Sequence, residues 1–263
     1  MEKYLILGGD KTARGIVDTL LSLKKEVIVV DPDFKDDEIK SENLKVYNKE
    51  ITDFKEDRNI FCGVTTVIIL VGKRIVNDVD EKTSLLLGNR RVIEDIDAKT
   101  IIKVMQVREI FERFYPNHTV RIIAEMIAKE NEKLFIDAGV DEIIPTDMLI
   151  EKIMVQMVFN EGIVSNLILT LLTRNDKAYL TTVTVSKDSE YKDFIGKTYD
   201  GLLLPLLDKG MQLIAIEKTS NKDSNERTSI HIMDRIIINP VESSEKNYSL
   251  RDNDRLIVLK EKG

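Results

Sequence analysis

Residues 4–30 read YLILGGDKTARGIVDTLLSLKKEVIVV, with two short apolar runs on either side of a segment of helical spacing. Residues 4–7 predict a strand that ends at Gly8-Gly9, and residues 26–30 predict a second strand. In between, apolar residues recur at the spacing of one helix face, namely Ala13, Ile16, Val17, Leu20 and Leu21. Strand, helix and strand in this order predict a βαβ unit with parallel strands.

The same alternation continues outward through the first half of the chain. Further apolar runs predict strands at 44–47, 65–71, 119–124 and 140–144, and helical spacing predicts helices at 98–114 and 131–137. The run at 65–71 carries no charge, as expected of a strand buried on both faces of a parallel sheet. Residues 1–146 are therefore expected to form a doubly wound α/β domain. Between 72 and 97 the pattern breaks, and we expect a long connection outside the sheet.

Residues 147–175 are apolar on almost every side of a helix, with an interruption at Glu161-Gly162. This pattern predicts a helix–turn–helix whose surface must be covered. We expect it to pack against the same segment of a second copy, and the expected interface residues are Met148, Ile153, Met157, Phe159, Leu167 and Leu171. The alternative is a bridge between two domains of a monomer.

The last third of the chain changes to short strands. Apolar runs at 179–185, 212–217, 235–238 and 255–259, with a helix within 196–207, predict a small α+β subdomain over residues 176–263. Residues 220–229 are polar enough to form a hairpin loop.

Composition excludes several classes of function. Lys and Arg total 39 against 46 Asp and Glu, a net charge of −7, so nucleic-acid binding is not expected. No run approaches the roughly 18 apolar residues of a membrane-spanning helix, so we expect no direct membrane insertion. The one cysteine, Cys62, cannot form an intrachain disulfide, which suits a reducing compartment. It lacks a local activating pattern and is expected to be a buried structural thiol.

The first strand-to-helix turn is the candidate ligand site, because doubly wound folds hold phosphates there. Its register resembles the dinucleotide fingerprint G-x-G-x-x-G/A, with Asp10 in place of the central glycine. A carboxylate there repels a pyrophosphate, and Asp10 also suits a helix N-cap. The candidate binding residues are the turn itself with two strand ends, namely Gly8, Gly9, Asp10, Lys11, Thr12, Ala13, Arg14, Asp31 and Gly72.

No catalytic pattern appears in the sequence, and we do not expect an enzyme. His118 and His231 lack partners at metal or triad spacing. An NAD-dependent oxidoreductase is the alternative from another class, and it would need a proton donor near the turn. Glu125 ends the fifth predicted strand on the side where such sheets bind ligands, and could coordinate a hard cation or a ribose.

Several segments, in order, resemble RCK domains, also called KTN domains. They are RIIAE at 121–125, DAGVDEIIP at 137–145, the apolar helix–turn–helix, IIINP at 236–240 and NYSLRDNDRLIVL at 247–259. RCK domains are cytosolic regulators of potassium channels and of Trk/Ktr-type transporters. The segment DAKTIIKVMQVREI at 97–110 resembles the fourth helix of the channel-type members.

The resemblance implies a Rossmann-like first lobe, a crossover helix pair at a homodimer interface, and dimers that build an octameric gating ring. It implies a potassium channel pore or a transporter membrane subunit as partner, and a place on the cytosolic face of the membrane. A freestanding nucleotide-binding subunit of a Trk/Ktr transporter is the alternative within the family.

Ligands implied by the resemblance are NAD(H), adenine nucleotides, cyclic di-AMP or calcium, and the sequence does not choose among them. The nucleotide turn maps to residues 8–13, the ribose carboxylate to Asp31, and a calcium-binding glutamate to Glu125. Two departures bear on this mapping. The second calcium carboxylate is Ile127 here, and the acidic residue after the third strand is displaced to Lys49-Glu50.

Overall fold

The computed structural model describes residues 2–8, 11–35, 39, 41–49, 58–71, 81–159, 163–172, 178–219 and 236–261. The chain divides into two compact units, Met1–Glu151 and Lys152–Gly263. The finer division at residues 146 and 175 stays a prediction.

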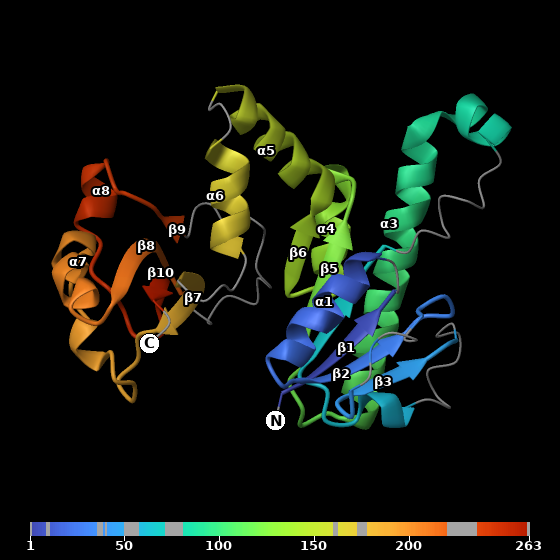
Figure 1. The fold of residues 1–263 in the computed structure, drawn as a ribbon, viewed down its shortest axis with the longest axis horizontal. Helices are drawn as coiled ribbons and strands as arrows, with labels where there is room; N and C mark the ends of the chain where they lie inside the picture. Colours follow the sequence, from blue (N-terminus) through green and yellow to red (C-terminus); the bar gives the residue numbers. More distant parts are fainter. Residues whose placement is uncertain are drawn as a thin grey trace. The chain divides into compact units, whose positions relative to one another are not determined.

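The first unit contains a six-stranded, all-parallel sheet in the order β3-β2-β1-β4-β5-β6 (Figure 1). The strands are β1 (Lys3–Leu7), β2 (Glu26–Val30), β3 (Leu44–Tyr47), β4 (Thr66–Ile69), β5 (Arg121–Met126) and β6 (Glu142–Pro145). The helices include α1 (Lys11–Ser22), α3 (Glu81–Phe114) and α4 (Glu132–Asp137), with 3-10 turns η1 (Arg58–Phe61) and η2 (Lys129–Asn131). The predicted doubly wound α/β fold is confirmed.

Helices cover the sheet on both faces because alternate residues of each strand point to opposite sides. Leu5 and Leu7 of β1 pack in one core with Val104 and Phe111 of α3. Ile6, between them, packs in a second core with α1. Both cores consist of aliphatic and aromatic side chains, which makes burial of apolar surface the main stabilising contribution.

Helix α3 corrects one expectation. Residues 72–97 were expected to form a long connection, but α3 begins at Glu81 and continues without a break to Phe114. Figure 1 shows its first part extending past the carboxyl ends of the strands. The segment lacks an apolar stripe but is rich in good helix formers such as Glu, Lys, Leu and Arg, whose backbone preference suffices for a helix.

The crossover forms two helices as predicted, α5 (Thr146–Phe159) and α6 (Ile163–Leu172). The boundary between the two units falls within α5, after Glu151. No helix in the described part of the chain is both long and apolar enough to cross a membrane.

The second unit contains, after α6, a small α+β subdomain of the predicted class. Its antiparallel sheet has the order β7-β10-β8-β9, from β7 (Ala178–Thr184), β8 (Met211–Glu217), β9 (Ile236–Ile237) and β10 (Arg255–Glu261). The helical elements are η3 (Lys192–Phe194), α7 (Tyr199–Leu207) and α8 (Ser243–Lys246). The loop predicted at 220–229 lies outside the described residues.

Cys62 corrects a second expectation, because it is exposed rather than buried. It follows η1 in a turn, where its backbone carbonyl accepts a hydrogen bond from Lys3 Nζ at 2.9 Å. The neighbouring Ile60 and Phe61 fill the core instead, so the short turn places Cys62 on the outside.

Candidate functional site at the carboxyl edge of the parallel sheet

The candidate site lies where β1 and β4 end side by side, the point at which the strand order reverses direction. Gly8 follows β1 with φ of +110°, a conformation that favours glycine. A β-carbon on Gly8 would lie 2.8 Å from the Leu70 carbonyl oxygen. Both observations fit the first glycine of a nucleotide-binding turn, which makes the turn tight.

Ala13 fits the last position of the same fingerprint. It is fully buried in the core that α1 forms with Ile6, Val29 and Leu70. The fingerprint needs a small residue there because the helix packs closely against the strands. The two described positions at the ends of the turn therefore have the expected geometry.

The predicted turn is described in part. Gly9, Asp10 and Gly72 lie outside the described residues, as does the side chain of Lys11. Thr12 is exposed and Arg14 is half-buried, and both make interactions within the chain. Their assignment to a ligand stays a prediction.

Asp31 directly follows β2, and the Gly8 amide donates to the carbonyl of the preceding Val30 at 3.4 Å. The structure thus brings Asp31 to the strand end next to Gly8. Asp31 Oδ1 accepts the Asp33 backbone amide at 2.7 Å, which closes a local turn around Pro32. This contact fixes the side chain in a half-buried position at the carboxyl edge.

Glu125 lies in β5 at the same edge, one residue before the strand ends. Its Oε2 accepts the Val71 amide and its Oε1 accepts the Thr146 hydroxyl, both at 2.9 Å. A carboxylate has further lone pairs, and a cation at Glu125 stays a prediction. Among the described residues, no group of three or more His, Cys, Asp or Glu side chains gathers to hold a metal.

Asp97 of α3 is a buried carboxylate that the sequence analysis missed. It is fully buried and accepts the amides of Ile127 and Ala128 at 3.0 and 2.9 Å, and Asn131 Nδ2 at 2.8 Å. Three donors compensate the negative charge, as a buried carboxylate requires. Asp97 therefore fixes the loop after β5, directly beyond Glu125. Its partners lie 30 or more residues away, so no local pattern could reveal them.

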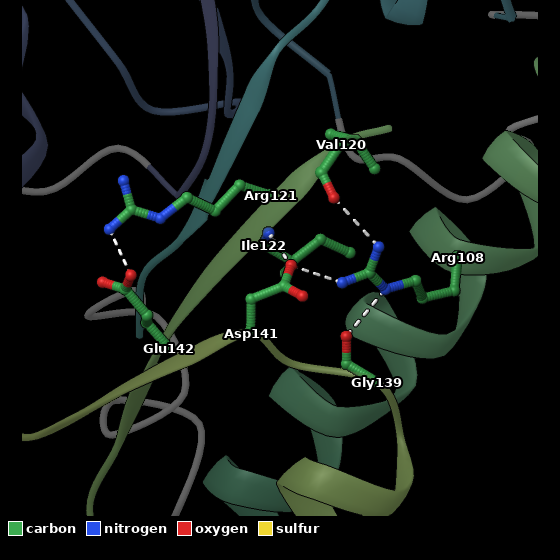
Figure 2. Close-up of polar contacts among 7 residues, drawn as sticks. All are labelled: Arg108, Val120, Arg121, Ile122, Gly139, Asp141 and Glu142. Carbon is green, nitrogen blue, oxygen red and sulfur yellow. Dashed lines mark hydrogen bonds and ion pairs between the residues drawn. The ribbon is translucent and has the colours of Figure 1, made fainter. Parts of the chain in front are cut away.

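Arg108 organises the opposite edge of the sheet, where β5 and β6 begin (Figure 2). Its Nε donates to the Gly139 carbonyl at 2.7 Å, and another guanidinium nitrogen donates to the Val120 carbonyl at 3.0 Å. It also pairs with Asp141, whose carboxylate accepts the Ile122 amide at 2.6 Å. This network sets the start of both strands and lies away from the candidate ligand edge.

A second buried carboxylate, Asp254, organises the second unit. Its Oδ1 accepts the Thr219 amide at 2.8 Å, and its Oδ2 accepts the Tyr248 hydroxyl and the Arg251 amide, both at 2.7 Å. Burial raises the pKa of the Tyr248 phenol above its usual range, and the hydrogen bond to Asp254 raises it further. The cluster closes the turn before β10.

Comparison with known proteins gives matches in structure only. No protein-family model and no curated protein sequence matches the chain. The human SLO3 gating ring matches with a TM-score of 0.59 at 17% identity, over 99% of this chain and 44% of that one. The RCK resemblance is confirmed at the level of the fold. The chain has the fold of that gating ring.

Two further solved structures match with lower scores. The GsuK channel bound to NAD has a TM-score of 0.44 at 15% identity, over 99% of this chain and 36% of that one. The TrkA-N domain of inner membrane protein ybaL from Escherichia coli has a TM-score of 0.38 at 11% identity, over 60% of this chain and 96% of that one. The chain spans less than half the length of the SLO3 and GsuK structures.

The crossover helices expose much of their apolar surface. None of the 14 residues of α5 is buried, and Val158 and Phe159 are 78% and 77% exposed. Of the predicted interface residues, Met157 and Phe159 are exposed, while Met148, Ile153 and Leu171 are half-buried. The side chain of Leu167 lies outside the described residues.

Proposed function

We propose that the chain is a ligand-sensing regulatory domain on the cytosolic side of the membrane. There it would control potassium transport through a channel pore. The observation that carries this proposal is the match to the SLO3 gating ring, which extends over 99% of the chain. The proposed role needs no catalytic group. A ligand that binds one arrangement of the lobes better than another shifts the population toward it.

The surface of α5 supports assembly into homodimers, and we propose that these form an octameric ring. Apolar side chains cover α5 on all sides, including Met154, Val158 and Phe159. Such a surface is costly in water, at about 25 cal/mol for each Å² of apolar area left exposed. Burial against the same helices of a second copy removes that cost and places the crossover at a subunit interface.

We propose that the ligand is NAD(H) or another adenine nucleotide, held at the Gly8 turn. The missing β-carbon of Gly8 allows the tight turn against Leu70, and Ala13 lets α1 pack closely on the strands, so both ends of the turn fit the nucleotide-binding fingerprint. Asp31, on the adjacent strand end, would accept a hydrogen bond from a ribose hydroxyl. Calcium at Glu125 is a second proposal, which the carboxylate chemistry allows.

The test is a thermal-shift screen of the full chain with NAD⁺, NADH, ATP, ADP, cyclic di-AMP, calcium and magnesium. A ligand at 100 times its Kd should stabilise the fold by about 2.7 kcal/mol. We expect a nucleotide to raise the Tm of the wild type and of Asp18→Asn, which changes an exposed carboxylate of α1. Asp31→Asn keeps an oxygen for the Asp33 amide but removes the charge, and should reduce the shift.

Two outcomes would contradict a nucleotide at the Gly8 turn, and a third would contradict a regulatory function. An unchanged shift in Asp31→Asn would move the nucleotide elsewhere, and a shift with calcium alone would favour the cation. Steady oxidation of NADH with a panel of small carbonyl compounds would establish an oxidoreductase instead of a regulatory domain.

A further inference from the structure

Glu125 joins two segments that are far apart in sequence. Its two carboxylate oxygens accept hydrogen bonds from the Val71 amide, two residues after β4, and from the Thr146 hydroxyl, in the first residue of α5. All three residues are half-buried, and both donor–acceptor distances are 2.9 Å. Hydrogen bonds to a charged acceptor are stronger than those between neutral groups. One residue of β5 therefore links the segment after β4 to the start of α5.

The contacts continue from Val71 toward the candidate nucleotide turn. Leu70, the preceding residue, donates its amide to the Leu7 carbonyl at 2.9 Å. Its own carbonyl oxygen faces Gly8 so closely that a β-carbon there would approach to 2.8 Å. A displacement of the Gly8 turn would therefore displace Leu70. Val71, the next residue in the chain, would move with Leu70. The described residues form an unbroken series of contacts from the turn to α5.

We infer that Glu125 is a positioning residue that couples the candidate ligand edge to α5. It makes the Val71 and Thr146 hydrogen bonds mutually dependent, because a shift of the carboxylate toward one donor changes its geometry at the other. A ligand that moves the Gly8 turn would then change the hydrogen bond between Glu125 and Thr146, the first residue of α5. This second step rests on the proposed function, whereas the mutual dependence of the two hydrogen bonds does not.

The first experiment needs no ligand. Amide hydrogen exchange of the full chain is followed by NMR in the wild type, Glu125→Gln, Thr146→Val and Thr146→Ser. Loss of the charged acceptor in Glu125→Gln should speed exchange of the Val71 amide by about tenfold or more. Thr146→Val removes only the distant hydroxyl, and should still speed Val71 exchange by about twofold or more. Thr146→Ser keeps a hydroxyl and should restore the wild-type rate.

A purely local role for Glu125 predicts a different pattern. Val71 exchange would then rise in Glu125→Gln but stay at the wild-type rate in Thr146→Val, and this result would overturn the inference. Faster exchange throughout the sheet in Thr146→Val would show general loosening and would overturn it as well. The strand β2, which Glu125 does not contact in the described structure, supplies the reference amides.

The second experiment uses NAD⁺ as the probe. In the wild type and Thr146→Ser, NAD⁺ should slow exchange of the amides at residues 147–150 of α5. In Thr146→Val the thermal shift with NAD⁺ should persist while this protection is lost. Protection that persists in Thr146→Val would overturn the coupling. Absence of any NAD⁺ effect on the wild type would instead count against NAD⁺ as the ligand, and the Val71 result would still decide the coupling of the two hydrogen bonds.

Discussion

Gly8 faces the carbonyl oxygen of Leu70 at a distance that leaves no room for a side chain. A β-carbon on Gly8 would lie 2.8 Å from that oxygen and 3.3 Å from the Leu70 β-carbon. The φ angle of +110° adds a conformational cost for any residue with a β-carbon. Glycine is thus required here both by space and by backbone geometry, at the turn where the chain leaves the first strand.

Gly8→Ala should therefore lower the free energy of unfolding by about 1–3 kcal/mol. The matched control is Gly15→Ala in α1, where a new β-carbon meets nothing within 4 Å. Removing an exposed glycine from a helix should raise stability by about 0.5–1 kcal/mol. Urea denaturation of both variants measures the difference. Equal stability of the two variants would contradict the close approach of Gly8 to Leu70.

Val158→Glu should weaken self-association, because a charge would replace an apolar side chain at the proposed dimer interface. Burial of a valine contributes about 1.5–3 kcal/mol, so the dimer Kd should rise at least about tenfold. Val241→Glu is the control, since Val241 is also a valine and is 77% exposed against 78% for Val158. Sedimentation equilibrium measures both. A Kd that rises equally in the two variants would contradict an interface at α5.

Asp97→Asn should destabilise the first unit by about 1–3 kcal/mol. The carboxylate accepts from three donors, and the amide nitrogen of asparagine would face at least one of them without an acceptor. Glu112→Gln changes an exposed carboxylate of the same helix and should alter stability by no more than about 0.5 kcal/mol. Thermal denaturation of the two variants provides the measurement, and a neutral Asp97→Asn would contradict the burial of its charge.

Tyr248 should make stability fall at high pH. Its pKa is raised in the folded chain by burial and then by its hydrogen bond to Asp254. The folded protein thus keeps a proton that the unfolded chain loses above about pH 10. This contribution to stability is complete below that pH and is lost progressively above it. Tyr248→Phe should be less stable than wild type at pH 8 by about 1 kcal/mol, and this deficit should shrink between pH 10 and 11. If the stabilities of wild type and Tyr248→Phe changed in parallel with pH, this result would contradict the raised pKa of Tyr248.

The fold could be predicted because most elements carry a local signal. The uncharged run ending in Leu70 and Val71 indicated a central parallel strand, and the apolar crossover indicated two helices around Glu161-Gly162. Helix α3 was missed between Glu81 and Asp97, since its first turns lack the apolar stripe on which periodicity depends. Summed helix propensity over that stretch could have found it.

The candidate site was predictable only in part. Gly8 and Ala13 have the geometry that their motif predicts. A tight turn needs glycine and close helix packing needs a small residue, so both requirements can be recognised in the local sequence. The partners of Asp97, Glu125 and Asp254 could not be predicted, since each carboxylate binds backbone amides whose positions depend on the finished fold. Backbone donors carry no residue-type signature.

The outward position of Cys62 has a practical use. As the single thiol of the chain, it offers one attachment point for a fluorophore or spin label without any substitution. Each copy in an assembly would then carry one label at an equivalent place on the first unit. Spectroscopic ruler measurements between copies could follow how these units separate or approach when a nucleotide is added, using the natural sequence throughout.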